Sequence, residues 1–369
     1  MEPVTFQAEI GKRIAQARET ASLTQAELAQ AMGVDRTSVV KLENGSRKVS
    51  ATELVAIAQA LDRSIDWFVF ESPPAVVSRR SDPAVGGQAN SLDVRVERLG
   101  RDVAFLLAEE VLSPVERPVF DVPSSQEEAE SLARDARALM GIGDGPIHDL
   151  QRSCERAGLL AFSLDLGAAG GDAAYVELGD WGVALVNGAI DPGRRRFNVA
   201  HELAHHLVGD AYAPEASILS GDGTEHYLNA FAIHLLMPRG AVTGMWESEP
   251  EREHRLRAIA LAARFRVSWT ATCSQLRTFG LINATEREEL ASSPPVKGEF
   301  FEVGEWWLPE LDAPSVPPGY ASRVVHAYRC GKLTAARTIE LLWGTMSEDE
   351  LPDVEEIPLE GLRREFEPL

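Results

Sequence analysis

The sequence predicts an α+β protein that is mostly helical, and two observations carry this prediction. Residues 9–68 hold a succession of short, capped helical patterns with no strand-like run between them. Three short apolar runs between residues 158 and 187 are typical of strands, and amphipathic helical patterns lie on both sides of them. The divisions we expect are a helical unit at 1–70, a linker at 71–91, a larger unit with a small sheet at 92–291 and a helical C-terminal region at 292–369.

Local capping signals define the helices of the first unit. Thr24 and Glu27 have the spacing of a capping box at the start of a short helix, and Gly33 suits the turn that ends it. Asp35 is the expected cap of the following helix, which stops at Asn44 and Gly45. An amphipathic helix precedes these two, and another begins near Ser50 and Thr52. A helix, a tight glycine turn and a second helix form the helix-turn-helix plan.

The rest of the chain follows from composition and periodicity. Residues 71–91 are rich in Pro, Gly and Ser and predict a flexible linker. Helices are expected at 92–113, 124–141 and 147–157, the second opened by a capping box of Ser125 and Glu128. Residues 292–319 predict an irregular connector. A last pair of short helices and an acidic tail complete the chain.

The sequence His201-Glu202-Leu203-Ala204-His205 is a HExxH motif. Residues four apart lie on one face of a helix, so both imidazoles can reach one metal ion. The glutamate beside the first histidine is placed to act as a general base. Pro192 suits the first turn of this helix, and Gly209 suits its end.

A tetrahedral zinc site needs a third protein ligand. Residues 225–238 predict a second helix, and Glu225 lies at its start. Asn229 is one turn further on the same face, where it can hydrogen-bond the outer nitrogen of a ligand histidine. Residue spacing leaves other candidates for the third ligand open, namely His226, Asp222 and Glu215.

The segments RRRFNVAHELAHHLVG and EHYLNAFAIHLLMP resemble the ImmA/IrrE family of zinc metallopeptidases over about residues 125–290. The resemblance implies a zincin-like domain of gluzincin type with one Zn²⁺ per chain. His201, His205 and Glu225 would be its ligands, and Glu202 its catalytic acid/base. Ala204 and Leu228 depart from the usual family residues without touching a ligand. Zincins align an extended substrate peptide along the edge strand of their small sheet.

The segment LTQAELAQAMGVDRTSVVKLENGSRKVSATELVAIAQAL resembles the Xre family, which implies a lambda-repressor-like DNA-binding domain. The resemblance places Gln25 at the opening of the second helix and the early residues of the third in the major groove. Basic residues after that helix would meet phosphates. The expected DNA contacts are Gln25, Arg36, Thr37, Ser38, Lys41, Arg47 and Lys48.

Composition limits the remaining classes. Acidic and basic residues are nearly balanced over residues 1–70, so the rest of the chain carries most of the net charge of −21. That net charge argues against binding to anionic membranes. The sequence has no apolar run long enough to predict a transmembrane helix, and its first residues do not have the pattern of a signal peptide. Three widely spaced cysteines fit reduced thiols rather than disulfides. We therefore expect a cytoplasmic protein.

The combined patterns predict a transcriptional regulator that binds a double-stranded DNA operator and carries a zinc-dependent endopeptidase. Its protein substrate would be a repressor or another regulator, and the chain could form a homodimer. Two alternatives stay open at this point. The zinc domain could sense a ligand or stress without proteolysis, or the chain could be an antitoxin-like or phage-defence regulator.

Overall fold

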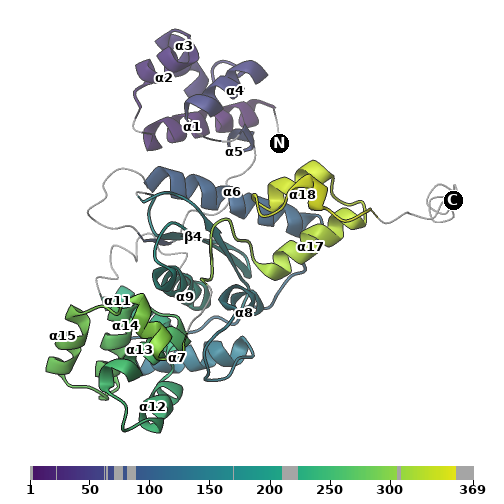
Figure 1. Cartoon of the computed structure of the whole chain (residues 1–369). Helices are drawn as coiled ribbons and strands as arrows, with labels where there is room; N and C mark the ends of the chain where they lie inside the picture. The colour runs from purple at the N-terminus through teal and green to yellow at the C-terminus, as the bar shows by residue number, and fades with distance from the viewer. Residues whose placement is uncertain are drawn as a thin grey trace, which may run out of the picture. The chain divides into compact units, whose positions relative to one another are not determined.

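The structure is a computed structural model that describes residues 3–21, 23–61, 63, 65–69, 78–80, 89–168, 170–209, 223–305 and 309–354 (Figure 1). The chain divides into two compact units, Met1–Ala75 and Val76–Leu369. Trp306, Trp307, Glu215, Asp222 and the acidic tail lie outside the described residues.

The first unit is helical, as predicted. Thr24 and Glu27 form the expected capping box, Asp35 caps the next helix through Ser38 N, and Ser50 forms a capping box with Glu53. These caps satisfy backbone N–H groups that helices leave open at their starts. Its helices are α1 (Pro3–Thr20), α2 (Gln25–Met32), α3 (Arg36–Glu43), α4 (Ala51–Ala60) and α5 (Ile65–Val69). Their buried side chains form one core that includes Ile14, Leu28, Val39, Leu42, Ile57 and Phe68.

The second unit contains a four-stranded sheet in the order β1-β3-β4-β2. β3 pairs antiparallel with β4 and β1, whereas β2 and β4 are parallel. The three strands predicted between residues 158 and 187 are confirmed, and the fourth was not expected. The strands are β1 (Ser78–Arg80), β2 (Leu159–Leu164), β3 (Ala173–Leu178) and β4 (Trp181–Asn187).

β1 corrects the prediction that residues 71–91 are linker throughout. Ser78 pairs with Tyr175 and Arg80 pairs with Ala173 on β3. A three-residue polar segment gives no strand signal by itself, because its pairing depends on a sheet edge formed almost 100 residues later. The helix expected at 92–113 also begins earlier, at Ala89, and ends at Ala108.

Helices cover both faces of the sheet (Figure 1). α6 (Ala89–Ala108), α17 (Pro318–Arg329) and α18 (Ala335–Leu341) pack on one face. The other face holds the core shared by α7 (Gln126–Leu139), α8 (Leu150–Arg156), α9 (Pro192–Val208) and α11 (Gly223–Leu236). β2, β3 and β4 are accordingly buried along almost their whole length, as strands covered on both faces must be.

Short helices complete the second unit. They are α12 (Arg239–Ser248), α13 (His254–Phe265), α14 (Trp269–Thr278), α15 (Ala284–Ser292), α16 (Lys297–Glu302) and the 3₁₀ turn Glu348–Glu350. α16 lies in the segment predicted to be irregular. Its Glu299 accepts a hydrogen bond from Val296 N and binds the Arg255 guanidinium at 2.7 Å, so a tertiary ion pair supports a helix too short to form alone.

No helix in the described parts of the chain has both the length and the apolar character needed to cross a membrane.

Candidate metal centre and nucleic-acid interface

α9 is held firmly at both ends. Asp191 caps it by accepting hydrogen bonds from Gly193 N and Arg194 N, and Pro192 occupies its first turn. Gly209 ends it at φ 62°, a left-handed conformation that suits glycine. Near its start, Arg195 donates to Leu311 O at 2.7 Å, and Arg196 pairs with Glu310. The HExxH motif therefore lies on a helix fixed by the sheet, by α11 and by residues 310–312.

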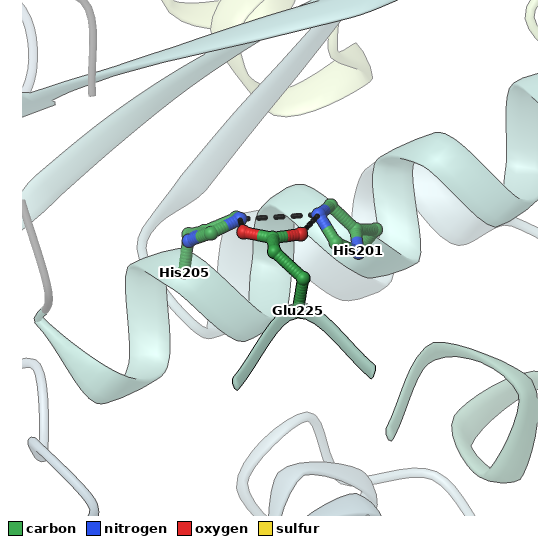
Figure 2. A group of neighbouring side chains, drawn as sticks. All are labelled: His201, His205 and Glu225. Atoms are coloured by element: carbon green, nitrogen blue, oxygen red, sulfur yellow. Dashed lines mark hydrogen bonds and ion pairs between the residues drawn. The ribbon is translucent and has the colours of Figure 1, made fainter. Parts of the chain in front are cut away.

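Three predicted ligands come together between α9 and α11. Nε2 of His201 lies 3.1 Å from Nε2 of His205. The Glu225 carboxylate faces both rings, at 3.4 Å from His201 Nε2 and 3.6 Å from His205 Nε2. Figure 2 shows the carboxylate beneath the two imidazole nitrogens, which point toward each other. Among the described residues, these three are the only group of His, Cys, Asp or Glu side chains with a metal-binding arrangement.

The spacing of these atoms fits a zinc ion. Zn–N and Zn–O bonds of roughly 2.0–2.2 Å in a tetrahedron place the ligand atoms about 3.3–3.5 Å apart. The three observed separations of 3.1, 3.4 and 3.6 Å bracket this range. Two imidazoles and one carboxylate are also a typical catalytic zinc set, which leaves the fourth position open. His226, the described rival for the third ligand, instead contacts Gln126 Nε2 at 2.8 Å.

Glu202 is fully buried, and neither of its carboxylate oxygens has a hydrogen-bond partner among the described residues. A buried carboxylate without partners is costly, so such a group in a folded protein usually serves a site that water or an ion enters. Glu202 follows the first candidate ligand directly on α9. Its burial and position fit a general base for a water molecule at the metal centre.

Asn229 lies one turn after Glu225, as expected, but its predicted hydrogen bond is not formed. Its Oδ1 is buried and accepts no hydrogen bond from any described residue. Asn198 was not among the residues predicted from the sequence. It is 1% exposed, and its Nδ2 has no hydrogen-bond partner among the described residues. Asn198 precedes His201 by three residues, so helical periodicity puts it on the same face as the ligands. That spacing could have identified it.

His206 has a structural place in the core. Its Nδ1 lies 2.9 Å from the Tyr175 hydroxyl, and its Nε2 lies 3.1 Å from Ala157 O. Burial, followed by the nearby Arg117 guanidinium, lowers the pKa of His206 to about 3, so the ring is neutral at physiological pH. Arg117 donates to His206 O at 2.8 Å and pairs with Glu177. Both ring nitrogens of His206 are therefore engaged by contacts in the core.

The side chain of His234 is also engaged by contacts in the core. It is 3% exposed, it contacts Gln275 Nε2 at 3.2 Å and its ring packs on Phe279. Burial lowers the pKa of His234. The remaining polar rings near Glu225 are those of His226 and Tyr227, whose centroids lie 5.4 Å apart in an edge-to-face pair.

In the first unit, the predicted DNA contacts divide into exposed and engaged side chains. Arg36, Lys41 and Lys48 are exposed on or just after α3. Thr37 and Ser38 hydroxyls donate to Asp35, so they also support the helix cap. Arg47 and Gln25 are partly buried.

Gln25 and Arg47 belong to ion-pair networks. Gln25 Nε2 donates to Glu43 at 2.8 Å, and the same carboxylate binds Arg18 Nε at 2.6 Å. This network joins the start of α2 to the end of α3 and fixes the angle between the two helices. Arg47 pairs with Glu53 of the next capping box. The exposed basic side chains are consequently presented by a rigid pair of helices.

Comparison with protein families separates the two units in the same way. A family model described as helix-turn-helix matches residues 14–68. The peptidase M78 model, described as the IrrE N-terminal-like domain, matches residues 154–277, which include the HExxH motif and Glu225. The chain joins an Xre-type helix-turn-helix domain to an IrrE-like domain of the M78 family.

Individual relatives resemble the helix-turn-helix domain. An uncharacterized HTH-type transcriptional regulator of Rickettsia conorii is 39% identical over 16% of this chain and 47% of its own length. An uncharacterized transcriptional regulator in the ATPase CF(0) region of Rhodospirillum rubrum is 39% identical over 16% of this chain and 56% of its own. The chain thus spans about half the length of these curated relatives.

Among solved structures, the restriction-modification controller protein C.AhdI of Aeromonas hydrophila is 32% identical. The match covers 17% of this chain and 94% of that one, with a TM-score of 0.17.

Proposed function

We propose that this chain is a DNA-binding transcriptional regulator whose IrrE-like domain is a zinc-dependent endopeptidase that cleaves a specific regulatory protein. The observation that carries the peptidase proposal is the convergence of two imidazole nitrogens and the Glu225 carboxylate beside the buried, unpartnered Glu202. A structural zinc site is closed by four protein ligands and has no use for a free carboxylate such as that of Glu202. Three candidate ligands with a free carboxylate beside them are typical of a catalytic site.

His201, His205 and Glu225 would hold one Zn²⁺, which when bound would polarise a peptide carbonyl and acidify water. Glu202 would accept the proton of the water that attacks the peptide carbonyl, and would pass it to the leaving amine. Neither carboxylate oxygen of Glu202 has a hydrogen-bond partner among the described residues, which leaves both oxygens available to that water. Asn198 and Asn229 would provide further hydrogen bonds at the metal centre through their unpartnered amide atoms.

Regulation by DNA binding is supported by the helix-turn-helix match and by the exposed Arg36, Lys41 and Lys48. The partner would be a double-stranded DNA operator, read from α3 in the major groove. Because each contact from a basic side chain to a phosphate releases counterions, the affinity of the first unit for DNA should fall as the salt concentration rises. Cleavage of a regulatory protein by the same chain would then couple proteolysis to transcription.

The peptidase proposal is tested by Glu202→Gln, which keeps the shape of the side chain and removes the base. This variant should bind one zinc per chain and bind DNA like the wild type, while His201→Ala and Glu225→Ala should lose the metal. Mass spectrometry of new protein N-termini in cells should show a cleavage product with the wild type and none with Glu202→Gln. Regulation that survives Glu202→Gln without cleavage would reject the peptidase proposal and favour a zinc domain that acts as a sensor, whereas cleavage that survives would show that Glu202 is not the base.

A further inference from the structure

A cavity of about 580 Å³ in the second unit is lined by side chains of α7, α11 and α12. Cavities that bind small molecules usually have volumes of roughly 300–1,000 Å³, so this one is large enough to hold a metabolite. Its lining combines charged groups of both signs. The carboxylates are those of Glu130, Asp144 and Glu247, and the guanidinium groups are those of Arg134, Arg137 and Arg239.

The cavity lies away from the metal centre. Gln126, at the start of α7, contacts His226 at the start of α11, and Arg137 near the end of α7 donates to Leu235 O near the end of α11. The two helices therefore run side by side in the same direction. Glu225 belongs to their first ends, whereas the cavity is lined near their last ends, at positions nine or more residues later on α11. Nine residues of helix span roughly 14 Å.

The charged groups of the lining differ in how they are engaged. Arg239 and Glu130 pair at 2.9 Å and neutralise each other. The side chains of Arg134, Asp144 and Glu247, by contrast, make no hydrogen bond or ion pair with any residue that the structure describes. The cavity therefore presents free carboxylates and a free guanidinium to whatever enters it.

Arg137 adds a buried positive charge to the cavity wall. It is 3% exposed, and its guanidinium donates to backbone carbonyl oxygens, among them those of Gly143 and Leu235. Burial lowers the pKa of Arg137 to about 10, against the effect of the nearby Asp144 carboxylate, so the group is a cation at physiological pH. Because its hydrogen-bond partners among the described residues are neutral, this buried cation favours an anionic group in the cavity.

The α12 side of the cavity is open because two glycines line it. Gly240 and Gly244 are four residues apart and lie on one face of the helix. A Cβ at Gly244 would meet nothing within 4 Å, and one at Gly240 would approach the Asp144 carboxylate at 3.8 Å. Packing within the described chain therefore does not require these glycines, although glycine weakens a helix interior relative to alanine. They leave space that a ligand can fill.

We propose that this cavity binds a small zwitterion with a free ammonium and a free carboxylate, of the class of an amino acid or a short peptide. The ligand's carboxylate would bind the Arg134 guanidinium, because these two groups form strong paired hydrogen bonds, and the charge of Arg137 would add to the attraction. Its ammonium would bind Asp144 and Glu247. A ligand of one sign would instead be repelled by part of the lining. The proposal does not depend on proteolysis.

Calorimetric titration of the full chain tests the need for both charges. The probes are the twenty common amino acids and the twenty dipeptides that begin with glycine. For each probe that binds, the N-acetyl derivative and the C-terminal amide are matched controls, since each lacks one charge. We expect binding by an amino acid or a dipeptide and an affinity at least tenfold lower for both derivatives. Binding by none of the probes, or by a derivative as tightly as by its parent, would overturn the proposal.

Substitutions locate the bound probe. Arg134→Gln and Asp144→Asn should each lower the affinity for the best probe by about tenfold, because each removes one charged partner. Arg277→Gln on α14 is the matched control, since Arg277 is exposed, lies outside the cavity and makes no hydrogen bond or ion pair with a described residue. Unchanged affinity in Arg134→Gln or Asp144→Asn would place the probe elsewhere and overturn the proposal.

Filling the cavity provides an independent test. Gly244→Leu should abolish probe binding, because the new side chain would extend into the open space beside α12. Gly298→Leu on α16 is its control, since a Cβ there would also meet nothing within 4 Å and Gly298 does not line the cavity. Both variants should unfold close to the wild-type temperature. A Gly244→Leu variant that binds the probe like the wild type would overturn the proposal. These measurements need neither zinc nor turnover, so a failure of the peptidase proposal would leave their outcome unaffected.

Discussion

The hydroxyl of Tyr175 lies 2.9 Å from Nδ1 of His206, so the sheet holds the residue that immediately follows the candidate ligand His205. Both side chains are fully buried. Gly182 on β4 makes room for the contact, since a Cβ at this position would lie 2.6 Å from His206 Nδ1. The His206 ring thus fixes the position of α9 against β3 and β4.

Tyr175→Phe should lower the free energy of unfolding by about 1–2 kcal/mol, because it removes a buried hydrogen bond and leaves part of the His206 ring unsatisfied. Urea denaturation of the full chain measures this change. Tyr328→Phe on α17 is the matched control, since no hydrogen bond of the Tyr328 hydroxyl to a described residue is present. Equal stability of the Tyr175 variant and the control would contradict a structural role for the contact.

Zinc removal should destabilise the IrrE-like domain. A ligand present at about 100 times its Kd and bound only to the folded state adds about 2.7 kcal/mol. EDTA should therefore lower the unfolding temperature of the wild type, and zinc should restore it. His201→Ala should show a lower unfolding temperature that responds to neither addition. A wild-type transition insensitive to both additions would show that His201, His205 and Glu225 hold no metal.

Much of this arrangement could be predicted from local sequence. The two candidate ligands on α9 follow from helical spacing. Thr24, Asp35, Ser50 and Asp191 act as caps because their short polar side chains reach nearby backbone N–H groups. The apolar runs of β2, β3 and β4 gave the central strands. These features depend on residues a few positions apart, where sequence patterns are most informative.

The features that could not be predicted from the sequence depend on contacts between residues far apart along the chain. β1 exists because Ser78–Arg80 meets the edge of β3, and Arg117 reaches His206 across 89 residues. The sequence alone does not show which way the ring of His206, next to the candidate ligand His205, is turned. One residue on a helix is a rotation of about 100°, which turned it toward the sheet instead of the metal.

The three thiols should differ in reactivity. Burial raises the pKa of Cys154, and burial also raises the pKa of Cys273 to about 11, whereas Cys330 is exposed. Because the thiolate is the reactive form, a thiol reagent at pH 8 should modify one cysteine quickly in the native chain and three after denaturation. Cys330→Ser should remove the fast phase. A second fast thiol in that variant would mean that one of the buried sites opens readily.

Acid should weaken the link between α7 and α12. The hydrogen bond from Arg239, at 2.9 Å, is the largest cause that lowers the pKa of Glu130 below its ordinary value of 4.5. The pair thus stabilises the fold above about pH 4.5, and this contribution is lost as pH falls through the lowered pKa of Glu130. Glu130→Gln should be less stable at pH 7 by at most about 1 kcal/mol, since the pair is partly exposed.

The difference between Glu130→Gln and the wild type should shrink as the pH is lowered from 5 to 3, as measured by urea denaturation at each pH. Asp135→Asn, on the same helix and outside this pair, is the control and should leave the difference between Glu130→Gln and the wild type unchanged. A difference that stays constant over this range would show that Arg239 does not stabilise the ionised Glu130.

DNA binding should separate the exposed basic residues from the buried network. Lys48→Ala removes an exposed charge, so the full chain should bind a mixed-sequence duplex more weakly. The slope of log K against log salt should become shallower by about 0.9, because one phosphate contact is lost.

Arg18→Ala breaks the pair with Glu43 at 2.6 Å, which leaves a carboxylate of 8% exposure without its main partner. We expect it to destabilise the first unit rather than to change the salt slope, because the loss acts on helix packing. Fluorescence anisotropy at several salt concentrations, beside thermal unfolding, distinguishes the two effects. If Arg18→Ala flattened the slope as Lys48→Ala does while unfolding at the wild-type temperature, Arg18 would be a phosphate contact and not part of the helix interface.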